Sequence, residues 1–218
     1  MGYSAQRIPY RETGSFSPLV MNYLDHHPSL QSFFSHEVSL RGIKDCIALR
    51  QQIPVDRNSL ADRLTKQYAG MEMTDSVQKN LNLLRQDNCY TVTTAHQNNL
   101  FSGPLYFIYK IVHAIALAEY LKRSIPDCNF VPVFYLGTED ADLAELDHVH
   151  IGAEKIQWNT RQTGAVGRMS IDQEMVKLID RIEGQLGVFP HGAEWISLLR
   201  ACYVEGRTVA EATFRLVH

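Results

Sequence analysis

The stretch from Tyr90 to Gly137 places the strongest constraint on what this chain can fold into. An apolar, β-prone run starting at Tyr90 enters a loop rich in His, Gln and Asn, and a long amphipathic pattern typical of a helix then begins at Ser102-Gly103-Pro104. A second apolar run, Phe130 to Gly137, follows that helix. Two strands joined by one helix form a βαβ unit with a right-handed crossover and parallel strands. The pattern therefore predicts an α/β fold in which the loops after both strands meet where open α/β sheets bind ligands.

The rest of the chain predicts helices around this core. The central helix is expected over Pro104 to Arg123, with an end signal at Pro126. Its broad apolar face carries Leu105, Ile108, Val112, Ile115 and Leu121. Other expected elements are helices over Asp56–Tyr68 and Asp75–Arg85, a hairpin over 155–169 with arms Lys155–Trp158 and Ala165–Met169, and a helical tail with capping boxes at Ser170–Gln173 and Thr208–Glu211.

These patterns divide the chain into three predicted parts. Residues 1–85 form a helical and extended lead-in, 86–152 the βαβ core, and 153–218 the hairpin with a helical connecting segment. Two parallel strands make a thin sheet, and the last helix reaches His218 without a Gly or Asn cap. We therefore expect the chain to be part of a longer protein and, with apolar surface left uncovered, to self-associate as a homo-oligomer.

Composition limits which partners and which cellular compartment we expect for this chain. The 218 residues have a formal net charge of −3 and 45% hydrophobic residues, which suits a packed core and gives no basic excess for binding nucleic acid. No apolar run reaches about 18 residues, so no membrane span is expected. The four cysteines are widely spaced without a Cys-x-x-Cys, which indicates reduced thiols and a cytoplasmic protein.

The first candidate cluster is the loop between the predicted strand and the central helix. Thr94, His96, Gln97, Asn98 and Asn99 offer hydrogen-bonding groups. Ser102 and Gly103 precede a helix N-terminus that suits a phosphate or carboxylate, and Gly103 would let the backbone approach a ligand closely. An ordinary βα loop capped by Ser102 would explain the same residues, because neither a P-loop nor a dinucleotide fingerprint is present.

The second cluster follows the second strand. Glu139, Asp140 and Asp142 could bind an amine or ribose hydroxyls, or hold Mg²⁺ through water, and are the candidate catalytic residues. Acidic residues also favour the start of a short helix, here 141–146, but that role accounts for one or two carboxylates rather than for the whole cluster. A zinc site built from His148, His150 and a carboxylate is an alternative that ranks below structural histidines, and no metal site is assigned.

The third cluster is Gly164-Ala-Val-Gly-Arg168. An arginine in a glycine-flanked strand can clamp a carboxylate or phosphate with its planar fork, although such residues more often form ion pairs.

At these three clusters the chain resembles the bacillithiol biosynthesis cysteine-adding enzymes, also described as cysteine ligases. The family's Thr-Gly-Gln-Gln-Pro-Gly-Leu-Phe-Gly-Gly-Pro-Leu-Tyr stretch stands here as Thr94–Tyr106, followed by Lys110, and its Ser-Glu-Asp-His-Asp matches 138–142. The Gly164–Met169 and Thr13–Ser17 segments are also similar, so the resemblance spans essentially the whole chain. The departures are Ala95 for Gly, His96 for Gln, Asn98 for Pro and Ala141 for His. The loss of that His implies either that no step depends on it or that His96 or His148 serves instead.

The resemblance implies a fold, a reaction and partners. It implies the N-terminal part of a Rossmann-like core similar to class I nucleotidyltransferases. The implied reaction is the last step of bacillithiol synthesis, in which cysteine is joined to the amine of glucosaminyl malate with ATP, with or without Mg²⁺. The site residues expected to bind substrate or nucleotide are Thr94, His96, Gln97, Asn98, Asn99, Ser102, Gly103 and Arg168. Two rival hypotheses stay open: a metal-dependent hydrolase or transferase using the acidic cluster, and a non-catalytic nucleotide-binding module.

Overall fold

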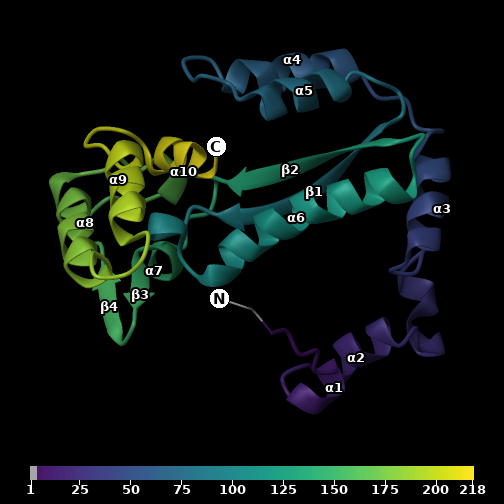
Figure 1. Ribbon diagram of the computed structural model, residues 1–218, viewed down its shortest axis with the longest axis horizontal. Coiled ribbons are helices and arrows are strands. Elements are labelled where there is room, and N and C mark those ends of the chain that lie inside the picture. Colours follow the sequence, from purple (N-terminus) through teal and green to yellow (C-terminus); the bar gives the residue numbers. More distant parts are fainter. Residues whose placement is uncertain (1–3) are drawn as a thin grey trace. The chain divides into compact units, whose positions relative to one another are not determined.

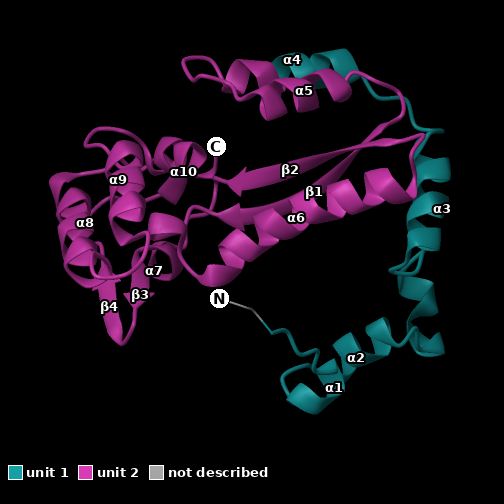
Figure 2. Ribbon diagram, in the orientation of Figure 1, with its two compact units in different colours: residues 1–63 teal, residues 64–218 magenta. Residues whose placement is uncertain are grey.

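The computed structural model describes residues 4–218, which form two compact units that divide between Arg63 and Leu64 (Figure 2). The first unit holds helices α1 (Tyr10–Thr13), α2 (Pro18–Leu24) and α3 (Leu40–Arg50) and the 3₁₀ turn η1 (Pro28–Phe33). Helix α4 (Arg57–Gln67) begins in the first unit and ends in the second. The second unit carries the sheet and all three candidate clusters.

The predicted βαβ unit forms the centre of the second unit. Strands β1 (Cys89–Gln97) and β2 (Asn129–Gly137) are parallel and paired from Cys89↔Asn129 to Gln97↔Gly137. Helix α6 (Leu105–Ser124) connects them and lies along the sheet, with α5 (Asp75–Leu83) also packing against β2 (Figure 1). The sequence pattern placed each of these elements to within a few residues.

The buried face of α6 differs from the predicted one. Phe107, Ala114, Ala118 and Leu121 are buried against the sheet, whereas Leu105 is 65% exposed and Val112 55% exposed. Of the predicted apolar face only Leu121 is in the core; Ile108 and Ile115 are exposed as well. The helix is apolar on almost every side, so its hydrophobic period could not select which face meets the sheet.

The predicted hairpin over 155–169 is wrong. The hairpin lies earlier: β3 (His148–Ile151) pairs antiparallel with β4 (Glu154–Gln157), with Gly152 at φ +59° in the turn. The Lys155 segment is thus the second arm of a hairpin and not the first. Residues Val166–Arg168 form the 3₁₀ turn η3 rather than a strand. The alternating residues of β3 have the period of a strand, but the histidines among them had been interpreted as possible metal ligands.

A helical layer completes the second unit. It contains the short helix α7 (Leu143–Leu146), then α8 (Gln173–Leu186), α9 (Gly192–Cys202) and α10 (Val209–Val217). One apolar core joins these helices to the β3–β4 hairpin and the loop after β1, and its fully buried side chains include Ile156, Met175, Ile179, Leu199 and Tyr203. No helix in the described part of the chain combines the length and apolarity needed to cross a membrane.

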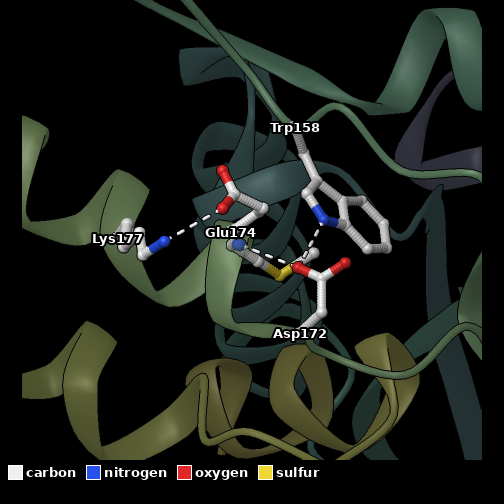
Figure 3. Close-up of polar contacts among 5 residues, drawn as sticks. Trp158, Asp172, Glu174 and Lys177 are labelled. Atoms are coloured by element: carbon white, nitrogen blue, oxygen red, sulfur yellow. Dashed lines mark hydrogen bonds and ion pairs between the residues drawn. The ribbon is translucent and has the colours of Figure 1, made fainter.

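The two predicted capping boxes have different outcomes. Thr208 and Glu211 form the expected reciprocal pair at the start of α10. At α8 the cap is Asp172, whose Oδ1 accepts from the Met175 N–H and from Trp158 Nε1, both at 2.9 Å (Figure 3). Ser170 instead forms a β-bridge with Thr208. The helix starts later than predicted because Asp172 is held in place by the buried indole as well as by the helix.

Candidate functional site

The first two polar clusters meet at the carboxyl ends of β1 and β2. The Gln97 side-chain amide donates to Asp140 Oδ2 at 3.0 Å and reaches Glu145 Oε2 at 3.4 Å. The next residue, Asn98, donates through Nδ2 to the Gly137 carbonyl at 3.2 Å. These contacts join two loops more than 35 residues apart in the chain, at the end of a parallel sheet where α/β folds place ligands.

The loop after β1 is buried to an unusual degree for a polar segment. Asn98 is 1% exposed and Asn99 6% exposed. The Asn98 Oδ1 atom has no hydrogen-bond partner among the described residues. A buried acceptor without a partner costs about 1–3 kcal/mol, so such an atom is a candidate for bonding to a hydroxyl or ammonium of a ligand.

The turn that follows has an uncommon backbone. Phe101, Ser102 and Gly103 all have positive φ, at +50°, +78° and +61°. A Cβ on Gly103 would lie 2.4 Å from Asn99 Cβ. Gly103 is therefore required by the packing of its own loop. Its role in letting a ligand approach the backbone stays a prediction. Two consecutive non-glycine residues at positive φ store strain, a feature that clusters at functional sites.

The start of α6 has no side-chain cap. Pro104 occupies the N-cap position without a side-chain hydrogen bond, and Ser102 is 7% exposed within the 3₁₀ turn η2 (Leu100–Ser102), so it does not cap α6 as expected. The first N–H groups of a helix lack partners within the helix, and the dipole of a 20-residue helix favours negative charge there. The start of α6 therefore has no side chain that caps its first N–H groups, and the binding of an anion there stays a prediction.

Thr94 and His96 lie on the face of the sheet that α6 covers, opposite to the face of Gln97. The His96 ring packs against Tyr106 and Phe107 of α6, with centroid distances of 5.1 and 5.6 Å. Burial lowers the pKa of His96, and the charge of Lys110 lowers it further, although the Gln97 carbonyl acts in the opposite direction. Thr94, two residues earlier, shares this face and lines a cavity with Ile111 and Ala114 of α6. The two residues are therefore close to the loop but directed away from the acidic cluster.

The acidic loop splits into one constrained and two exposed carboxylates. Asp140 Oδ1 accepts from the Asp142 N–H at 2.8 Å; this bond and the one from Gln97 lower the pKa of Asp140. Glu139 is exposed and accepts from the Tyr135 hydroxyl at 3.3 Å. Asp142 is exposed at the N-cap position of α7 but makes no capping bond, so helix capping does not account for its carboxylate.

The third cluster, residues 164–168, packs against the second, the acidic loop after β2. The Val166 N–H donates to the Asp140 carbonyl at 2.8 Å, and Gly167 lies so close to Thr138 that an added Cβ would be 2.7 Å from its carbonyl oxygen. Arg168, the next residue, is exposed and forms no ion pair with the described residues. All three predicted clusters thus adjoin one another, although the sequence had placed the third on a strand.

Two residues of this region escaped the sequence analysis as site residues. Tyr203 is fully buried; its hydroxyl accepts from the Phe101 N–H at 3.1 Å, and its ring lies 4.8 Å from that of Phe101. Tyr203 therefore anchors the strained turn to the helical layer, and no local sequence signal could have shown this. Glu145 contacts Gln97 from the short helix α7, and its place three residues after Asp142 was the available clue.

The histidines considered for zinc lie on β3. The buried Asp147 accepts from Gln157 Nε2 at 2.7 Å and lies 2.9 Å from His148 Nδ1. The His148 and His150 rings are 5.2 Å apart. Across residues 4–218, no group of three His, Cys, Asp or Glu side chains is arranged to hold a metal ion.

Comparisons with known proteins identify the family. The model of the bacillithiol biosynthesis BshC N-terminal Rossmann-like domain matches residues 3–218. Proteins named "Putative cysteine ligase BshC" are 38% identical in Flavobacterium psychrophilum, 36% in Flavobacterium johnsoniae and 33% in Cytophaga hutchinsonii, over 94%, 94% and 99% of this chain. In each case the match spans only 39% of the relative's length. With its parallel βαβ core and the site at its strand ends, the chain belongs to the BshC family of bacillithiol biosynthesis and corresponds to the family's N-terminal Rossmann-like domain.

Proposed function

We propose that the full-length protein joins cysteine to the amine of glucosaminyl malate, the last step of bacillithiol synthesis, with ATP as the activating co-substrate. One observation supports this proposal most strongly. Gln97 and Asn98 bind the loop after β2, so the loop that leads into α6 and a set of carboxylates adjoin one another at the strand ends. Forming an amide from two charged substrates needs groups of both kinds.

The activation step needs a site that binds the phosphates of ATP. The cysteine carboxylate would attack a phosphorus atom of ATP, giving an acyl phosphate with ADP or an acyl adenylate with pyrophosphate. We assign the phosphates to the N–H groups at the start of α6, which carries no side-chain cap. Asn98 Oδ1 accepts hydrogen bonds only, so it suits a ribose hydroxyl or an ammonium rather than a phosphate.

The second step calls for carboxylates. The amine of glucosaminyl malate would attack the activated carbonyl carbon, release phosphate or AMP, and lose a proton. The lowered pKa of Asp140 makes it a weak base, so we assign it to binding the ammonium form. The exposed Glu139 and Asp142 are the candidates for accepting the proton or for holding Mg²⁺ through water. Arg168 is the candidate for a malate carboxylate.

A direct assay tests this proposal. The full-length protein is incubated with cysteine and glucosaminyl malate, with and without ATP, and bacillithiol is followed by mass spectrometry together with ADP and AMP. ATP-dependent product is expected, and the nucleotide released identifies the activated intermediate. Product formation that is unaffected by ATP removal would overturn the ATP assignment, and cysteine-independent hydrolysis of the substrate would favour the rival hydrolase hypothesis.

A further inference from the structure

Asp147 and His148 form a carboxylate–imidazole pair where the short helix α7 leads into strand β3 (Figure 1). Asp147 is 7% exposed, its Oδ2 accepts from Gln157 Nε2 at 2.7 Å, and its Oδ1 lies 2.9 Å from His148 Nδ1. A carboxylate accepts hydrogen bonds and donates none, so Nδ1 carries the ring hydrogen. The lone pair of Nε2 is then free to accept a proton, and no described residue forms a hydrogen bond with that atom.

The contact with Asp147 holds the imidazole of His148 in one tautomer and one orientation. A carboxylate in this position prepares a histidine to act as a general base, because it also stabilises the imidazolium that forms when the ring takes up a proton. The His148 side chain is 23% exposed, so a ligand can reach its ring, whereas the Asp147 side chain is only 10% exposed. His150, two residues further on the same face of β3, forms no such pair with the described residues.

The pair adjoins the acidic loop of the candidate site. Gln97 Nε2 contacts both Asp140 and Glu145, at 3.0 and 3.4 Å, so these two carboxylates lie beside the same amide. Glu145 and His148 are three residues apart, and because the two residues between them are helical, the backbone atoms of Glu145 and His148 are only about 6 Å apart. Strand β3 also packs against the turn η2 that follows β1. His148 therefore lies beside the candidate site and not in a separate part of the fold.

We propose that His148 is the general base of the amide-forming step and that Asp147 positions it, an inference that rests on the proposed ligase reaction. The amine nitrogen, held near Asp140, attacks the activated carbonyl carbon. As the C–N bond forms, the surplus proton of the nitrogen passes to His148 Nε2, and the bond from that carbon to the phosphate oxygen breaks with its electron pair on the oxygen. The imidazolium then releases the proton to solvent. Near neutral pH an imidazole accepts a proton better than an exposed carboxylate does, which leaves Glu139 and Asp142 for Mg²⁺.

Two histidine variants of the full-length protein test the role of His148. His148→Gln should lower kcat about 100-fold or more, as expected for the loss of a general base, with little change in KM. His150→Gln is the matched control, because its ring lies on the same face of β3 and 5.2 Å from that of His148, and it should leave kcat nearly unchanged. A His148→Gln protein with the turnover of the parent would overturn the proposal. An equal loss in both variants would also overturn it, because the effect would then belong to the hairpin and not to one ring.

Asp147→Asn tests the positioning role separately. The asparagine oxygen can still accept from Gln157, but its NH₂ group would donate to His148 Nδ1 and move the ring hydrogen to Nε2, which then cannot accept a proton. We expect kcat to fall about 100-fold or more, with KM and the melting temperature nearly unchanged. An Asp147→Asn protein with the kcat of the parent would show that Asp147 does not position the ring.

Chemical modification separates this proposal from the proposed reaction, because it needs no turnover. Diethyl pyrocarbonate acylates a free imidazole nitrogen, and mass spectrometry follows the modification of His148 and His150 in the full-length parent protein. Glucosaminyl malate should slow the modification of His148 several-fold and leave that of His150 nearly unchanged. Equal rates with and without this substrate would overturn the proposal, even if His148→Gln fails to fold or the parent protein makes product from ATP. Protection of His148 in a protein that makes no product would refute the ligase reaction and keep His148 in the binding site.

Discussion

Asp140 is the residue through which the candidate site is held together. One carboxylate oxygen binds Gln97, the other fixes its own loop at Asp142, and its carbonyl receives the Val166 N–H. Glu139 and Asp142, by contrast, are exposed. At the scale of single residues, the site therefore combines one carboxylate with fixed partners and two that are free to meet a ligand.

Asp140→Asn and Asp142→Asn should each lower turnover of the full-length protein far more than its stability. An amide can still accept the loop hydrogen bond but has no charge for an ammonium, and lost acid–base or charge catalysis is worth about 10²-fold or more. Steady-state kinetics and thermal unfolding measure the two effects. Asp127→Asn, an exposed acid beside the amino end of β2, is the matched control. Preserved turnover with lost stability would assign these carboxylates to the fold.

Tyr203→Phe should destabilise the turn after β1. The variant leaves the buried Phe101 N–H without its partner, which costs about 1–3 kcal/mol in the free energy of unfolding. Urea denaturation measures the loss, and Tyr120→Phe, at a half-exposed tyrosine of α6, should change stability little. If both variants are equally stable, Tyr203 does not anchor the turn.

At the scale of elements, the start of α6, with the loop from Asn98 to Pro104 before it, differs from the start of α10. Three successive positive φ angles bring Asn99 against Gly103, and the first turn of α6 is left without a side-chain cap. Helix α10, in contrast, begins with a complete capping box. Helix α6, which follows the loop of the candidate site, has no such cap.

Gly103→Ala should damage the loop itself. The new Cβ would collide with Asn99, and the φ of +61° with ψ of −138° is accessible almost only to glycine. Gly164→Ala is the matched control, since its φ is +94° but an added Cβ would meet no atom within 4 Å. Melting temperatures should fall more for Gly103→Ala. An equal fall would show that backbone strain alone, and not contact with Asn99, fixes glycine at 103.

Thr208→Ala should lower the stability of the second unit by about 1 kcal/mol, the usual cost of losing an N-cap. The Thr208 backbone and hydroxyl also lower the pKa of Glu211 from its ordinary 4.5. A carboxyl with a depressed pKa stabilises the fold above that ordinary value, and the contribution disappears as the pH falls through the lowered pKa. Thermal unfolding at pH 7 and pH 3 should therefore differ less in Thr208→Ala than in the parent chain, although the backbone N–H of residue 208 still bonds Glu211. An unchanged difference would exclude the Thr208 hydroxyl as a source of the pH dependence.

At the scale of the whole molecule, the described residues leave one sheet edge and one helix face uncovered. The chain spans 39% of the relatives it matches, its sheet has two strands among the described residues, and α6 exposes an apolar stripe. The surface of a stable monomer seldom leaves such a stripe open.

The 218-residue chain alone should have no ligase activity and should self-associate. Its candidate site holds the start of α6, which has no side-chain cap, and a set of carboxylates, but the described residues leave one sheet edge and one helix face unpaired. Turnover and sedimentation of this chain are compared with those of the full-length protein. A monomer that makes bacillithiol at a rate close to that of the full-length protein would refute both the expected incompleteness and the assignment of the site.

The sequence by itself determined the elements of the central βαβ unit and their order. The apolar runs ending at Gln97 and Gly137, with one helical period between them, were sufficient to predict a parallel βαβ unit with polar loops at one edge, because these signals lie within each segment. The sequence also predicted the α10 capping box, whose two members are three residues apart.

Only the tertiary structure decided how the segments face one another. The α6 helix has apolar residues all round, so contact with the sheet selected Phe107 and Ala114 rather than Leu105 and Val112. The indole of Trp158 helped to fix Asp172 as the cap of α8, and Asp140 acquired its partners from residues far away in the chain. Burial and hydrogen bonding depend on neighbours that a local pattern does not contain. For that reason the βαβ elements and the α10 cap could be predicted, while the buried face of α6, the cap of α8 and the partners of Asp140 could not.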